Sequence, residues 1–122
     1  MTIAVPQPIA RYFAGKNAGD LSDALAAFSE KAVVADESKT YATTAAIRAW
    51  MEETSRKYND RAEVKAVTSD GEATRVTALV SGDFPGSPVT LQFRFVLDDG
   101  LISAWTSDRD DPGDWTKVRL RS

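Results

Sequence analysis

The spacing of apolar residues changes near Ala62, and this change limits the folds open to the chain. Before Ala62, apolar residues recur every three or four positions, which is typical of helices that bury one face. After it they recur at every second position, as Val89, Leu91 and Phe93 do, which is typical of a strand with one buried face. Helices followed by a meander of strands predict an α+β fold, in which three helices cover one face of an antiparallel sheet.

The first two predicted helices have clear end signals. The first carries Tyr12 on its apolar face and ends at Gly19, a residue suited to the left-handed position that follows a helix. Asp20 is a good cap for the second helix, because its carboxylate can accept a hydrogen bond from a free backbone N–H of the first turn. We expect this helix to place Phe28 on its apolar stripe and to end near residues 29–31.

The third helix is predicted to begin at Thr43 or Thr44, to bury Trp50 and to end at residues 59–60. Gly-containing turns separate the strands that follow. The sequence does not determine on which face of the last strand Trp105 lies, because a bulge would reverse the alternation of faces. The predicted strands are residues 32–35, 62–68, 73–84, 89–97 and 101–107.

The chain of 122 residues contains no cysteine and no histidine. Disulfides, thiolate nucleophiles, imidazole metal sites and the usual Ser-His machinery are therefore excluded. Acid–base chemistry would have to use Asp, Glu, Tyr or Lys. No composition shift divides the sequence, so we expect one domain over residues 1–122 with a loosely ordered tail from about residue 109.

The charge distribution argues against several partners. The net charge is −3, and nucleic-acid binders usually carry a basic surplus that neutralises phosphates. We find no apolar run of membrane-spanning length and no signal peptide, so we expect a cytoplasmic protein. The segment 107–114, which is rich in Asp, lacks the calcium-loop pattern, so we expect a solvated loop there. We expect no metal and no cofactor.

Several short segments resemble the nuclear transport factor 2-like superfamily, which includes SnoaL-like domains and bacterial ketosteroid isomerase. The resemblance implies a cone of three helices on a strongly curved antiparallel sheet, a cystatin-like α+β barrel, and a homodimer formed through the outer face of the sheet. The matching segments are Arg11-Tyr12-Phe13-Ala14, Asn17-Ala18-Gly19-Asp20-Leu21, Ala27-Phe28, Val34-Ala35-Asp36, Thr44-Ala45-Ala46-Ile47-Arg48, Trp50, Phe93-Arg94-Phe95 and Leu101-Ile102-Ser103.

The same resemblance suggests where the chemistry would lie. Counted without gaps from Tyr12, Asp36 falls where ketosteroid isomerases keep the Asp that moves the proton. Tyr12 falls where they keep a donor to the oxyanion, but Leu91 stands where they keep a second donor, a protonated Asp. An alkyl group cannot donate a hydrogen bond, so we expect slow turnover of a steroid enone.

Each of these residues also has a structural interpretation. Asp36 could be a solvated turn residue and Tyr12 a core tyrosine. Four apolar residues could either belong to the core or line a ligand cavity, since the core and the cavity wall are continuous in the resembled fold. They are Phe28, Trp50, Leu91 and Phe93.

Three functions therefore remain open. The first is a cofactor-independent isomerase or lyase with Asp36 as base and Tyr12 as oxygen donor. Its ligand would be a small apolar molecule, with a planar carbonyl compound as the expected type. The second is a non-catalytic ligand-binding or dimerisation module, and the third is a SnoaL-like polyketide cyclase that uses Asp108.

Overall fold

The structure, a computed structural model, describes residues 4–36 and 39–107, which form three helices and six strands. The helices are α1 (Gln7–Ala18), α2 (Leu21–Leu25) and α3 (Thr44–Tyr58). The strands are β1 (Phe28–Asp36), β2 (Lys39–Tyr41), β3 (Arg61–Asp70), β4 (Ala73–Ser81), β5 (Val89–Asp98) and β6 (Leu101–Ser107). The predicted tail from residue 109 lies outside the described residues.

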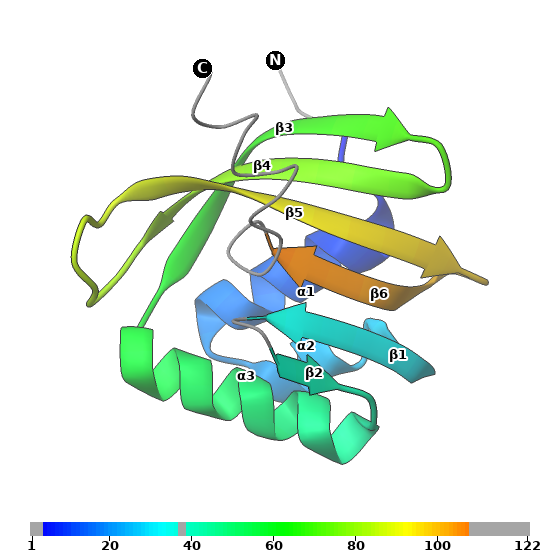
Figure 1. The fold of residues 1–122 in the computed structure, drawn as a ribbon, viewed down its shortest axis with the longest axis horizontal. Helices are drawn as coiled ribbons and strands as arrows, with labels where there is room; N and C mark the ends of the chain where they lie inside the picture. The colour runs from blue at the N-terminus through cyan, green and yellow to red at the C-terminus, as the bar shows by residue number, and fades with distance from the viewer. Residues whose placement is uncertain (1–3, 37–38, 108–122) are drawn as a thin grey trace.

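The strands form one curved sheet in the order β2-β1-β6-β5-β4-β3. The three helices lie on one side of it, with α3 along the end where β1 and β2 lie (Figure 1). This arrangement confirms the predicted α+β fold. The sheet is antiparallel except for the pair β1–β6, which is parallel and joins the first strand of the chain to the last described one.

The segment between α1 and α2 shows why its residues are suited to this fold. Gly19 adopts φ 77° after α1, a left-handed conformation that costs glycine little. The Asp20 side chain accepts a hydrogen bond from the Asp23 N–H at 3.1 Å and so caps α2 as predicted. Asn17 reaches across to β3, where its amide donates to the Ala62 carbonyl (2.8 Å) and accepts from the Ala62 N–H (2.9 Å). These contacts join the end of α1 to the first strand of the meander.

After α2 the structure contradicts one sequence prediction and adds one strand that the sequence did not predict. The second helix ends at Leu25, not near residues 29–31, because Phe28 already pairs with Ile102 of β6 and begins β1. The strand β2 was not predicted, because Lys39–Tyr41 has no apolar alternation and serves as a short edge strand against the end of β1.

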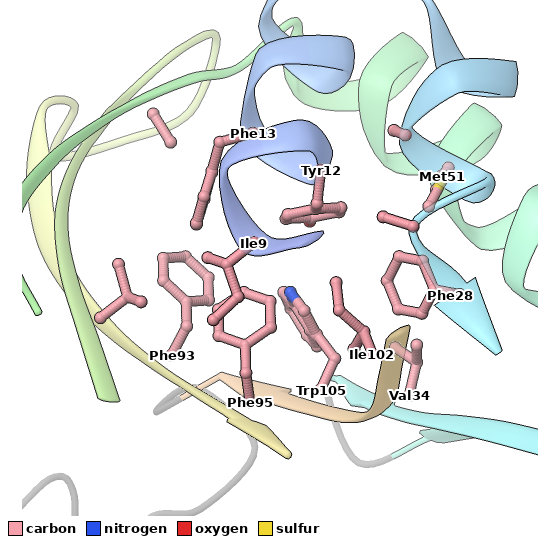
Figure 2. Packing of buried hydrophobic residues seen from close by; sticks show 14 of the residues in the cluster. Ile9, Tyr12, Phe13, Phe28, Val34, Met51, Phe93, Phe95, Ile102 and Trp105 are labelled. Carbon is pink, nitrogen blue, oxygen red and sulfur yellow. The ribbon is translucent and has the colours of Figure 1, made fainter. Parts of the chain in front are cut away.

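The core lies between the helices and the concave face of the sheet (Figure 2). Tyr12 of α1 is at its centre, with ring centroids 5.0 Å from Phe13, 5.6 Å from Phe28 and 5.9 Å from Phe95, all edge-on. Edge-to-face rings at these distances are favourable beyond the area they bury. Helix α1 therefore presents its buried face to an aromatic layer built by the sheet.

Replacing Asn17 by Ala should lower the free energy of unfolding by about 1–3 kcal/mol, because the buried backbone groups of Ala62 lose their partners. Chemical denaturation monitored by circular dichroism would measure this loss. The exposed Ala14→Ser change on the same helix is a control and should cost less than about 0.5 kcal/mol. Equal stability of Asn17→Ala and the unmodified protein would contradict the anchoring role.

Candidate functional site

A small cavity lies between α1, α3 and the sheet. Its volume is about 20 Å³, enough for one water-sized group. The mouth of the cavity is marked by the lining residues that are partly exposed, Lys16, Thr54 and Asp60. There, Lys16 Nζ forms an ion pair with Asp60 Oδ1 at 2.7 Å. The lining consists of Tyr12, Phe13, Lys16, Asp36, Trp50, Thr54, Asp60, Ala62, Val80, Leu91, Phe93 and Trp105.

Asp36 is a buried carboxylate with two defined donors. Its side chain is at the end of β1 and the residue is 1% exposed. Its Oδ2 accepts a hydrogen bond from Trp50 Nε1 at 3.0 Å, and its Oδ1 accepts one from Ser107 Oγ at 2.9 Å. A buried carboxylate is costly unless donors replace its lost water, and these two donors do so. The interpretation of Asp36 as a solvated turn residue is therefore wrong.

The register of the parallel pair explains how Ser107 reaches Asp36. Val34 pairs with Trp105 and Ala35 with Thr106, so the next residues along the two strands, Asp36 and Ser107, lie side by side. Trp50 approaches the same carboxylate from α3. Three elements that are far apart in the sequence thus hold one side chain.

Tyr12 lines the same cavity as Asp36 and is 1% exposed. Its ring belongs to the aromatic core, so its position fits the core interpretation and the ligand-facing interpretation together. The structure brings Tyr12, Asp36 and Trp50 to one cavity, together with Leu91 and Phe93.

Phe28 does not line this cavity, contrary to its predicted place in the wall. It is the first residue of β1, whereas Asp36 is the last, so the two lie at opposite ends of a nine-residue strand. The Phe28 side chain instead contributes to the core, where its ring is nearly perpendicular to that of Tyr12. Asp108, the alternative catalytic residue, lies outside the described residues.

Sequence reasoning missed Ser107 and did not settle Trp105. Ile102 and Trp105 both point inward although they are three residues apart, because β6 is irregular where it passes Val96 and Leu97 of β5. This irregularity reverses the alternation and turns Trp105, 2% exposed, into the cavity. With Trp105 inward, alternation places Ser107 on the same side.

The described residues contain no group of three or more His, Cys, Asp or Glu side chains that could hold a metal ion. Among the helices of residues 4–36 and 39–107, none is long and apolar enough to cross a membrane. The site therefore offers a carboxylate and a phenol in the wall of a mostly apolar cavity, with the Lys16–Asp60 ion pair at its mouth.

The hydrogen bond from Trp50 to Asp36 should contribute measurably to stability. Trp50→Phe removes it, and a hydrogen bond to a charged group is worth about 1.5–3 kcal/mol. Trp105→Phe is a matched control, because it removes the same atoms from an equally buried indole without breaking a hydrogen bond among the described residues. Urea denaturation of both variants should show the larger loss for Trp50→Phe, and equal losses would contradict the role of this bond.

Comparison with known proteins gives the family. The family model of the SnoaL-like domain matches residues 9–105 of the sequence. A solved structure of a candidate polyketide cyclase from Sinorhizobium meliloti is 34% identical, with a TM-score of 0.81, over 84% of this chain and 94% of that one. No curated protein matches the chain significantly.

More distant structures share the fold. A protein from Catenulispora acidiphila with a ketosteroid isomerase-like fold, solved with trimethylamine, is 14% identical, with a TM-score of 0.73, and 85% of each chain is covered. A candidate ketosteroid isomerase from Kribbella flavida is 16% identical, with a TM-score of 0.71, over 84% of this chain and 74% of that one. The family match spans most of the sequence and agrees with the fold built from its residues. The chain therefore belongs to the SnoaL-like domain family of the nuclear transport factor 2-like superfamily.

Proposed function

We propose that this protein binds a small planar carbonyl compound in the cavity and moves a proton next to the carbonyl, with Asp36 as the base. The observation that supports this most is the placement of Asp36: a carboxylate 1% exposed, in the wall of a mostly apolar cavity, with its orientation fixed by two donors. A base held in one orientation and shielded from water is well suited to abstracting a proton from carbon.

The donors to Asp36 leave this role open. Each carboxylate oxygen can accept more than one hydrogen bond, so Trp50 and Ser107 do not by themselves saturate the group. They limit the rotation of the carboxylate and so fix its orientation relative to the cavity. Trp50 and Ser107 therefore act as positioning residues for the proposed base.

Tyr12 would supply the complementary interaction. In the proposed reaction the C–H bond next to the carbonyl breaks, its proton moves to a carboxylate oxygen of Asp36, and the electron pair moves onto the carbonyl oxygen. The Tyr12 hydroxyl, in the same cavity wall, would donate a hydrogen bond to that oxygen. Return of the proton from Asp36 to a carbon further along the conjugated system then completes an isomerisation.

The cavity size favours a small substrate. Ligand pockets for drug-sized molecules usually measure about 300–1,000 Å³, far more than the cavity next to Asp36. A ring-sized ligand could enter only if side chains at the mouth move, above all the paired Lys16 and Asp60. This supports a compact carbonyl compound over a steroid.

Similarity to the candidate polyketide cyclase fits a carbonyl ligand as well. A cyclase that uses Asp108, and binding without turnover, are the alternatives that the following experiment separates.

Asp36→Asn should abolish the catalysed conversion of cyclohex-3-enone to cyclohex-2-enone, because an amide is not a base at neutral pH. The conjugated product is followed by its ultraviolet absorbance. Asparagine can keep the local contacts, since its oxygen can accept from Trp50 and its NH₂ can donate to the Ser107 hydroxyl.

Glu30→Gln is the matched control, because it neutralises an exposed carboxylate on the same strand and should leave the rate unchanged. Turnover that persists in Asp36→Asn would overturn Asp36 as the base and leave an acid elsewhere, such as Asp108. Binding of the enone without turnover in the unmodified protein would favour the non-catalytic alternative.

We also propose that the protein is a homodimer formed through the outer face of the sheet. No described helix covers this face (Figure 1). Alternation with the core residues places Thr77, Val96 and Ala104 on it, beside the paired Arg75 and Arg94. Light scattering at 10–100 µM should give about twice the 13.3 kDa chain mass, and Ala104→Lys should shift the mass to that of one chain. A single-chain mass for the unmodified protein would contradict this proposal.

A further inference from the structure

The indole N–H of Trp105 is a buried donor without an acceptor. Trp105 is 2% exposed, and its Nε1 has no hydrogen-bond partner among residues 4–36 and 39–107. Most buried polar groups in folded proteins are hydrogen-bonded, since an unsatisfied donor loses its water and gains nothing in exchange. Such a group therefore requires an explanation, and one known reason is a functional site.

The location of this N–H connects it with the cavity. Trp105 lines the cavity together with Tyr12 and Asp36. Its ring centroid lies 4.7 Å from that of Trp50 and 6.4 Å from that of Tyr12, which fixes the plane of the indole. Figure 2 shows the Trp105 nitrogen at the end of the indole that points away from β6 and toward Tyr12.

The two tryptophans of the site differ in how their N–H groups are used. Trp50 donates to Asp36 at 3.0 Å and is therefore engaged in holding the base. The Trp105 N–H is engaged with nothing in the described chain. An indole nitrogen can donate but cannot accept, so its partner must be an atom with a lone pair, such as a ligand oxygen.

We propose that the Trp105 N–H donates a hydrogen bond to the carbonyl oxygen of the bound ligand, so that the cavity selects compounds with an oxygen acceptor. This inference rests on the proposed function and adds the group that recognises the substrate. It also supplies, from β6, a donor that Leu91 on β5 cannot provide, because its side chain is purely apolar. The available volume of about 20 Å³ corresponds to one oxygen-sized group, so the donor fits the polar end of the ligand.

The test uses two probes of nearly the same shape, cyclohex-2-enone and cyclohexene, with the full chain labelled with ¹⁵N at its tryptophan indoles. Only the enone has an oxygen acceptor, and the chain has no cysteine that could add to it. The variants Trp50→Phe and Trp105→Phe each remove one indole signal and so assign the spectrum. On titration with the enone, the Trp105 indole proton should move downfield to a saturating shift that cyclohexene does not produce.

Trp105→Phe should weaken enone binding about three- to tenfold, as expected for one lost hydrogen bond, and leave cyclohexene binding unchanged. Because this change removes an unsatisfied group, the free variant should remain folded. Trp50→Phe shows what happens when an engaged indole is lost: its effect should appear in unfolding stability.

The outcomes separate this inference from the proposed function. If the enone shifts the Trp105 signal but is not formed from its isomer, the donor role stands and the catalytic proposal fails. If the enone does not bind, if it binds without moving the Trp105 signal, or if Trp105→Phe binds it equally well, the donor role is overturned. In the last two cases turnover that depends on Asp36 would still support the catalytic proposal.

Discussion

The Asp36 carboxylate depends on hydrogen bonds from two different elements, and the candidate site depends on that carboxylate. Trp50 reaches it from α3 and Ser107 reaches it from β6, while Asp36 itself ends β1. A charged group 1% exposed is tolerated only with such partners, because the energy of its lost hydration must be recovered inside the protein. The position of the helices relative to the sheet is therefore tied to the geometry of the site.

The wall of the cavity and the core of the protein consist of the same side chains. Tyr12, Phe93 and Trp105 belong to the aromatic core and also line the cavity. A substitution that enlarges the cavity would thus remove packing from the core, and its effect on binding cannot be read without its effect on stability. The paired tryptophan variants are useful for this reason, since both indoles are almost fully buried and only one is hydrogen-bonded in the described chain.

The sequence predicts much of the fold because its strongest signals are local. The change of apolar spacing at Ala62, the left-handed Gly19 and the capping Asp20 each determine structure through near neighbours. By contrast, the early start of β1 at Phe28 depends on pairing with Ile102, a residue far along the chain. Local propensity carries no information about that contact.

The same distinction applies to the site. Asp36 and Tyr12 could be proposed from a resemblance in the first third of the sequence, and the structure brings both to one cavity. The Ser107 contact and the inward face of Trp105 could not, since both follow from an irregularity in the pairing of β6 with β5. Alternation along a strand predicts faces only where pairing is regular.

The parallel pairing of β1 with β6 has a consequence for the order in which the molecule can form. Asp36 and Ser107 are 71 residues apart, whereas all the other strand pairs of the described sheet connect strands that are consecutive in sequence. Contacts between distant segments require closure of a long loop, whose entropy cost is paid before the contact contributes. A chain still leaving the ribosome could form the β3–β4 hairpin and α3 while β6 is missing. The buried carboxylate would then lack the Ser107 donor until the last described strand is in place, so the site is completed only as folding ends.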